Sequence, residues 1–220
     1  MLKETIEAVL FDLDGTLMET DDHTVERLAK ILTWFRLPLP ERKARWLVMK
    51  GEGPVNGMIT LADRLGLDQL FSKTMMGSTR MNTSGKKPFR MMEGAGQMLA
   101  QLKPFFRLGL VTTNSQAEAE AFLEKNNLSE IFDVVVSRFT TRRLKPHPEP
   151  LLFAAKQLGT VPERCLMVGD TTPDMKAAVA AGAIPVGVLC GFGTRDELLK
   201  SGARAILEHT REVVQLMGVS

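Results

Sequence analysis

Cysteine is scarce in this chain, and neither a large charge excess nor a long apolar stretch is present. The two cysteines, Cys165 and Cys190, lack the spacing of a metal site, so we expect reduced thiols in a cytoplasmic protein. A net charge of +2 gives no electrostatic argument for a nucleic-acid partner. No apolar stretch approaches the length that crosses a bilayer, and the N-terminus lacks a signal-peptide pattern, so we expect no membrane association.

No internal repeat occurs, and no G-x-x-x-x-G-K-[ST] run, which excludes P-loop chemistry. Apolar runs of strand length alternate instead with helical segments. The predicted strands cover 6–11, 106–111, 132–136, 165–168 and 184–189, and the predicted helices between them cover 94–102, 116–125, 149–158 and 173–181. This alternation predicts an α/β fold: a Rossmann-like parallel sheet with helices on both faces. Such sheets bind ligands beyond the carboxyl ends of their strands.

Residues 18–86 differ from the rest because they contain helical patterns and no predicted strand. Helices are predicted over 20–35, 41–50 and 55–65, and a polar linker precedes residue 88. We therefore predict an α/β core domain made of 1–17 and 87–220, with an all-α domain, 18–86, inserted after the first strand.

Two acids follow the first apolar run. Asp12 and Asp14 point the same way because alternate residues of an extended chain share a face, and Gly15 permits a sharp turn. Two such carboxylates repel each other unless a cation lies between them or one holds a proton. The ordinary alternative is a strand followed by a solvated Asp-Gly turn.

Polar residues also follow the second and third predicted strands. The segment 112–115 contains Thr112, Thr113, Asn114 and Ser115, which suit either an anion site at a helix start or a simple N-cap. Lys145 stands before three alternating prolines, which predict a stiff extended segment that holds the lysine in place. The alternative for Lys145 is an ordinary surface lysine.

Two more acids follow the fourth predicted strand, and either could be only a helix cap. Asp170 ends the buried run, and Asp174 lies near the start of the next helix. A parallel sheet gathers all these residues at one edge. Clustered carboxylates suit a hard cation, most plausibly Mg²⁺, while a lysine and a hydroxyl suit phosphate oxygens. A carboxylate beside a metal can attack phosphorus and form an aspartyl-phosphate.

With these motifs in order, the chain resembles the haloacid dehalogenase superfamily of phosphohydrolases, in its phosphoglycolate phosphatase and β-phosphoglucomutase-like branch. The similar motifs are 11–17, 111–114, 145–146 and 169–174, and the tail 191–203 is similar to the same branch. The resemblance implies that the inserted domain, 18–86, is a helical cap.

The resemblance implies a role for each motif residue. Asp12 would be the nucleophile, Asp14 the general acid and base, and Lys145 a further catalytic residue. Phosphate would be bound by Asp12, Leu13, Thr112, Thr113 and Lys145. Mg²⁺ would be bound by the Asp12 carboxylate, the Asp14 main-chain carbonyl and Asp170, with Asn114 and Asp174 in supporting positions.

The predicted function is therefore a Mg²⁺-dependent phosphatase that hydrolyses a small phosphorylated metabolite, as a monomer or weak homodimer. One alternative is a sugar-phosphate mutase, which the fold also hosts. It is disfavoured because Pro54 and Val55 follow Gly53, where such mutases commonly carry an arginine. Another is a non-catalytic phosphate-binding or regulatory protein. Against that alternative, each catalytic position holds a competent residue.

Overall fold

The computed structural model describes residues 5–19 and 89–219. Within these ranges, residues 5–19 and 90–219 lie in one compact unit. The predicted helical domain, apart from its first two positions, lies outside the described residues, and so do Pro54 and Val55. No helix of the described ranges has the length and apolarity needed to cross a membrane.

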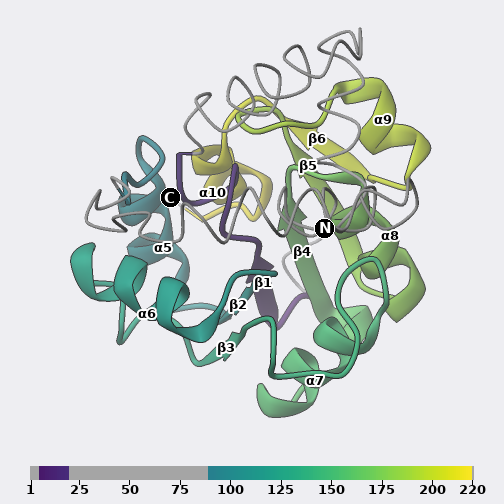
Figure 1. Ribbon diagram of the computed structural model, residues 1–220. Helices are drawn as coiled ribbons and strands as arrows, with labels where there is room; N and C mark the ends of the chain where they lie inside the picture. Colours follow the sequence, from purple (N-terminus) through teal and green to yellow (C-terminus); the bar gives the residue numbers. More distant parts are fainter. Residues whose placement is uncertain (1–4, 20–88, 220) are drawn as a thin grey trace, which may run out of the picture. The chain divides into compact units, whose positions relative to one another are not determined.

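A single sheet of six parallel strands forms the centre of this unit (Figure 1). The strands are β1 (Ala8–Phe11), β2 (Arg107–Val111), β3 (Val134–Val136), β4 (Cys165–Gly169), β5 (Ile184–Val188) and β6 (Ala205–Leu207). Their order in the sheet is β3-β2-β1-β4-β5-β6, and every neighbouring pair is parallel. The predicted fold class is confirmed, with one strand, β6, more than the sequence pattern indicated.

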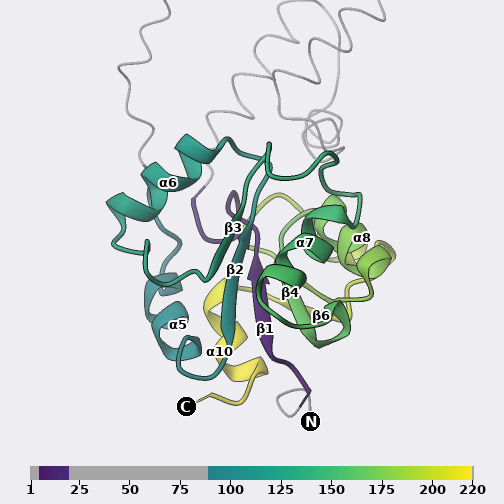
Figure 2. The same cartoon turned by 90° about the horizontal axis from the view of Figure 1, so that it is seen from below.

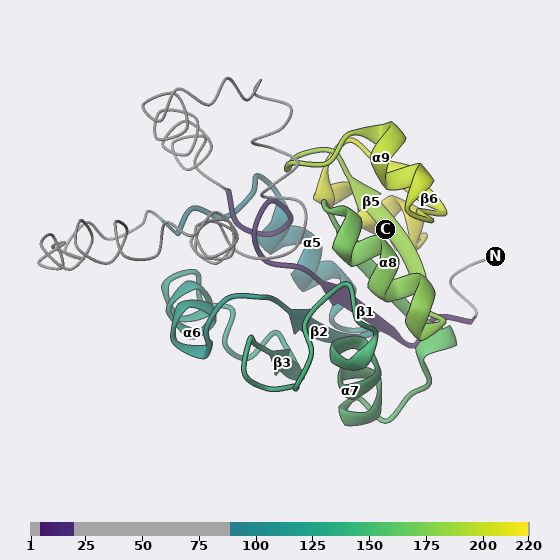
Figure 3. The ribbon, with the colours of Figure 1, turned by 45° about the vertical axis from the view of Figure 1, so that its right-hand side comes forward.

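Helices cover both faces of the sheet. They are α5 (Ala95–Leu102), α6 (Gln116–Lys125), α7 (Glu149–Gln157), α8 (Thr172–Ala181), α9 (Arg195–Lys200) and α10 (Val213–Leu216), with short 3₁₀ turns η2 (Pro162–Arg164) and η3 (Thr210–Glu212). In Figure 2, α5, α6 and α10 lie on one side of the strands, and α7 and α8 lie on the other. The short helix α9 lies beside α8 and contacts β5 and β6 (Figure 3).

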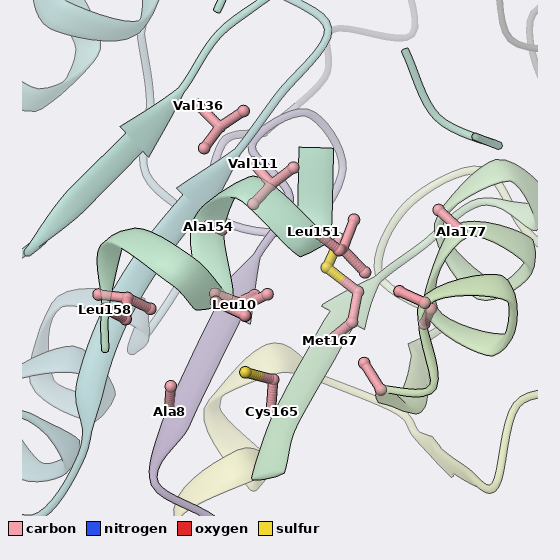
Figure 4. Packing of buried hydrophobic residues seen from close by; sticks show 14 residues of the cluster. Ala8, Leu10, Val111, Val136, Leu151, Ala154, Leu158, Cys165, Met167 and Ala177 are labelled. Atoms are coloured by element: carbon pink, nitrogen blue, oxygen red, sulfur yellow. The ribbon is translucent and has the colours of Figure 1, made fainter. Parts of the chain in front are cut away.

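The face beneath α7 and α8 contains a dense apolar cluster (Figure 4). Leu10 and Met167 of the central strands are fully buried there, and Leu151 packs against them from α7. Alanines at Ala154 and Ala177 present little bulk to the sheet, which allows both helices to pack closely on the strands. Near-continuous apolar strands are expected of a parallel sheet covered on both faces.

The sheet order places β1 in the centre, between β2 and β4. Phe11, the last residue of β1, is in register with Leu110 on one side and Val168 on the other. The segments that follow these three strands therefore leave the sheet side by side. From β1 the chain adds β2 and β3 on one side of the sheet, and then β4, β5 and β6 on the other. Open α/β sheets bind ligands at the carboxyl ends of the strands where the strand order reverses in this way.

Candidate active site

The turn after β1 carries the first two acids. Asp12 is buried, with 6% of its surface exposed, and Asp14 is half-buried. The carbonyl oxygen of Leu13 accepts hydrogen bonds from the next residues of the turn, and Gly15 has a φ of +71°. A Cβ atom on Gly15 would lie 2.3 Å from Oδ2 of Asp170. The predicted turn is present, and glycine is required there both for its φ and for the space that Asp170 occupies.

Lys145 lies buried beside this turn, with 4% of its surface exposed. Its Nζ is 2.6 Å from Oδ1 of Asp12, 2.6 Å from Oδ1 of Asp174, and 2.8 Å from the carbonyl oxygen of Val111. Nζ donates hydrogen bonds to Asp12 and to the Val111 carbonyl, while its contact with Asp174 is an ion pair in which Oδ1 of Asp174 accepts no hydrogen bond from the described residues. Burial lowers the pKa of Lys145, but the two carboxylates outweigh it and raise the pKa above its ordinary value. The alternative of a surface lysine is wrong.

The segment that holds Lys145 is a turn, whereas the sequence predicted a stiff extended segment. The N–H of His147 donates to the carbonyl of Leu144 at 2.9 Å, and the peptide between Lys145 and Pro146 is cis. A cis proline at the third position defines a type VI turn, and prolines suit such a turn as well as an extended chain. The turn leads directly into α7 at Glu149.

Asp170 and Asp174, which follow β4, are both fully buried. Oδ1 of Asp170 accepts a hydrogen bond from Oγ1 of Thr16 at 3.2 Å, and its Oδ2 accepts one from the N–H of Phe192 at 2.8 Å. Oδ2 of Asp174 accepts hydrogen bonds from the N–H and the hydroxyl of Thr171, which makes it part of the cap of α8. Asp174 therefore has two roles at once, since its other oxygen contacts Lys145.

Three acids, Asp12, Asp170 and Asp174, lie close enough to share a cation, with one oxygen of each within 4.8 Å of the others. Burial raises the pKa of Asp12 to about 7. Lys145 opposes this shift, and the neighbouring acids Asp174 and Asp14 add to it. Burial, together with repulsion from Asp12 and Asp174, also raises the pKa of Asp170 well above its ordinary value. One buried lysine does not balance three buried acids in the described part of the chain, so an oxygen-ligated divalent cation fits this cluster.

The segment after β2 reaches toward Asp14. Nδ2 of Asn114 donates to Oδ2 of Asp14 at 2.6 Å, and the N–H of Asn114 donates to Oγ1 of Thr112 at 3.0 Å. Thr112 is buried and does not cap α6, because Ser115 occupies that position and accepts from the N–H of Glu118. The capping alternative is therefore confirmed for Ser115 and wrong for Thr112.

Two main-chain N–H groups at this edge have no protein acceptor within residues 5–19 and 89–219. They belong to Leu13, after β1, and Thr113, after β2. Buried or partly buried N–H groups are nearly always hydrogen-bonded in folded proteins. Donors of this kind suit the oxygens of an anion.

The sequence pattern missed the groups that hold Asp170 from its far side. They are the hydroxyl of Thr16, which follows Gly15 in the chain, and the N–H of Phe192, which lies between Gly191 and Gly193. A Cβ atom on Gly191 would lie 2.0 Å from Oδ2 of Asp170, and one on Gly193 would lie 2.2 Å from its main-chain oxygen. The spacing Gly191-Phe192-Gly193 was the available signal, because paired glycines often mark a close approach of the backbone.

The buried acid trio and the buried lysine lie together at the carboxyl edge of a parallel sheet, where open α/β sheets bind ligands. The sequence profile of the haloacid dehalogenase-like hydrolases matches residues 9–188, so the chain belongs to that family. Phosphoglycolate phosphatase of Nitrosococcus oceani is 30% identical over 233 residues, which cover 99% of this chain and 98% of the relative. The predicted family and the enzyme class, a phosphatase of this family, are confirmed.

Other relatives of similar sequence identity have names that specify different substrates. N-acetylmuramic acid 6-phosphate phosphatase of Pseudomonas aeruginosa is 29% identical over 222 residues, which cover 99% of this chain and 97% of the relative. A solved haloacid dehalogenase-like hydrolase from Bacteroides fragilis shares the fold, with a TM-score of 0.76 at 24% identity, covering 94% of this chain and 99% of that one.

Proposed function

We propose that this protein is a Mg²⁺-dependent phosphatase that hydrolyses a small phosphomonoester through an aspartyl-phosphate on Asp12. The observation that carries the proposal is that the two acids after β1, Asp12 and Asp14, differ in burial and in hydrogen-bond partner. Asp12 is buried and its Oδ1 is held by Lys145 at 2.6 Å, whereas Asp14 is half-buried and held by Asn114 at 2.6 Å. Two acids in different environments are suited to different chemical roles.

In the first step, a carboxylate oxygen of Asp12 attacks phosphorus. The new bond joins that oxygen to phosphorus, the bond from phosphorus to the leaving oxygen breaks, and Asp14 gives a proton to the leaving oxygen. In the second step, Asp14 takes a proton from a water molecule that attacks the aspartyl-phosphate. Inorganic phosphate leaves, and both carboxyl groups return to their starting protonation states.

Lys145 orients the nucleophile and offsets its charge. Its contact with Oδ1 leaves the other oxygen of Asp12 for the attack, and its second contact, with Asp174, holds the ammonium in place. The N–H groups of Leu13 and Thr113 and the hydroxyl of Thr112 are the proposed partners of the phosphoryl oxygens. Donors aimed at these oxygens stabilise the charge that develops in the transition state.

Mg²⁺ is proposed to lie beside the acid trio, with the carboxylates of Asp12 and Asp170 and the main-chain carbonyl of Asp14 as ligands and Asp174 in a supporting position. The metal would supply positive charge that offsets both the carboxylates and the phosphate dianion. Asp170 is suited to this position because hydrogen bonds from Thr16 and Phe192 hold both of its oxygens. Such partners orient the ligands of a metal.

The substrate class we propose is a small phosphorylated metabolite. Two relatives at 30% and 29% identity have names that specify different esters, so overall similarity does not select one. We propose that residues 18–86 form the helical cap and that this segment chooses the leaving group. This assignment agrees with the position of the segment in the chain, after the turn that carries Asp12 and Asp14.

Phosphate release from a panel of phosphomonoesters tests the proposal, with Mg²⁺ in one arm and a chelator in the other. The panel should contain phosphoglycolate, sugar phosphates, nucleoside monophosphates and pyrophosphate. We expect release that depends on Mg²⁺ and is lost in Asp12→Asn, while circular dichroism shows an unchanged fold. Turnover at the wild-type rate in a clean preparation of D12N, or turnover unaffected by the chelator, would refute the mechanism. A mutase would release little phosphate and would require a bisphosphate activator.

A further inference from the structure

A hydroxyl from the C-terminal part of the chain contacts the turn that carries Asp14. Thr210 begins η3 and is 2% exposed, and its Oγ1 donates to the main-chain oxygen of Thr16 at 2.6 Å. The two residues are 194 positions apart in the chain. None of the motifs that identify the family includes Thr210, and the proposed mechanism does not use it.

Cys190 contacts the same turn from a second direction. Its Sγ is 3.2 Å from Oγ1 of Thr210 and 3.4 Å from the main-chain oxygen of Gly15. The Thr210 hydroxyl has one hydrogen, which its 2.6 Å bond to Thr16 already uses, so the thiol is the donor in the contact with Thr210. The thiol also has a single hydrogen, so it donates either to Thr210 or to the carbonyl of Gly15, whereas Thr210 holds the carbonyl of Thr16. A thiol is a weak donor, so Thr210 is the stronger of the two anchors.

Thr16 transmits this contact to Asp170. The main-chain oxygen of Thr16 accepts from Thr210, while its side-chain Oγ1 donates to Oδ1 of Asp170 at 3.2 Å. Little free space surrounds Asp170, since a single added carbon on Gly15 or Gly191 would lie within 2.3 Å of its Oδ2. A shift of the Thr16 backbone would therefore move the carboxylate or break its hydrogen bond.

We propose that Thr210 is a positioning residue, which fixes the carboxylate of Asp170 and the turn that carries Asp14 by holding the main chain of Thr16. The proposal rests on the proposed function, in which Asp170 binds the metal. Thr210 touches neither substrate nor metal and acts only through Thr16. Loss of a group that orients a metal ligand without touching the metal typically lowers metal affinity or activity by about 10–100-fold.

The test compares three variants of the full chain by calorimetric titration with Mg²⁺ and by the rate of phosphate release. Thr210→Val removes the hydroxyl and keeps the shape, and Thr210→Ser keeps the hydroxyl. Thr160→Val is the matched control, because Oγ1 of Thr160 also donates a 2.6 Å hydrogen bond, to Glu7 before the amino end of β1. We expect T210V to bind Mg²⁺ about 10–100-fold more weakly, while T210S and T160V resemble wild type.

A double-mutant cycle separates positioning from a general loss of stability. Thr16→Val removes the hydrogen bond to Asp170, so adding T210V to it should weaken Mg²⁺ binding much less than T210V does alone. Losses that add in the double variant, or T210V that binds Mg²⁺ like wild type, would overturn the proposal. Should T210V not fold, Thr210→Ala carries the same expectation without placing a methyl group against the Thr16 carbonyl. Failure of wild type itself to bind Mg²⁺ and release phosphate would instead refute the proposed function.

Discussion

Replacing Lys145 with methionine tests how the site is held together. The variant keeps a long side chain but removes the ammonium, whose Nζ lies 2.6 Å from Asp12, 2.6 Å from Asp174 and 2.8 Å from the Val111 carbonyl. Asp12 and Asp174 would then share a buried space with no cation between them. The expected result is a large loss of stability as well as of activity, because buried charges are stable only when they are paired.

The size of the effect follows from burial. Removing one partner of a buried ion pair costs about 3–5 kcal/mol. Lys103→Met is the matched control, since Lys103 also lies 2.6 Å from a carboxylate oxygen, on Asp133, but the two side chains are 31% and 39% exposed. An exposed pair contributes about 0.2–1 kcal/mol. Both variants lose one positive charge, so a difference of about 2–5 kcal/mol between them isolates the effect of burial.

Urea unfolding with a chelator present measures the two free energies, because a bound cation would partly replace the missing ammonium. Both tryptophans, Trp34 and Trp46, belong to the unit formed by 21–89 and not to the unit that contains Lys145, so far-ultraviolet circular dichroism is the suitable signal. The dependence of the free energy on urea should be equal in the variants, which shows that each exposes the same surface on unfolding.

Two results would refute this reasoning. Equal losses of stability in K145M and K103M would show that the buried contacts of Lys145 contribute no more than a surface ion pair does. The double variant K145M/D174N should also recover part of the lost stability, because it removes one of the uncompensated charges. A double variant that is less stable than K145M would contradict the assignment of the loss to repulsion between buried acids.

Two further predictions concern a close contact at the site and an acid, Asp133, at the amino edge of the sheet, directly before β3. Gly191→Ala should weaken Mg²⁺ binding measured by calorimetry, because its Cβ would lie 2.0 Å from Oδ2 of Asp170, and wild-type affinity would contradict this account. Burial raises the pKa of Asp133, but hydrogen bonds from Lys103 and the Leu108 N–H outweigh it and hold the pKa below its usual range. The stability that Asp133 contributes is therefore present above its unfolded pKa and lost as pH falls through the folded one. Urea unfolding should show a difference between wild type and Asp133→Asn that is largest near pH 7 and shrinks below about pH 4.

The regular elements of the α/β unit follow from local patterns in the sequence. Helix α6 covers the same residues as predicted, 116–125, because Ser115 and Glu118 form a capping box at its start. The strands β2, β4 and β5 were each predicted to within about one residue of their observed bounds. The edge strand β6 was missed because it has three residues and is only partly buried, so neither its length nor its periodicity stands out.

The contacts of the site were predictable only in part. Asp12 and Lys145 were singled out by motif, but the turn around Lys145 was predicted as an extended segment. Asp174 could have been a cap or a partner of Lys145, and the structure shows that each of its oxygens has one of these roles. Local sequence cannot decide such a question, because a cap depends on neighbours in the chain and an ion pair depends on the fold.

The sequence by itself therefore determined the family, the α/β class and the residue types that gather at the carboxyl edge of the sheet. These properties depend on alternation, turns and ordered motifs, which are local. Only the tertiary structure decided that Asp170 is held by Thr16 and Phe192, and that Thr210 supports Thr16 from 194 residues away. The physical reason is that hydrogen bonds of 2.6–3.2 Å depend on how separate segments pack, and no periodicity within one segment encodes that distance.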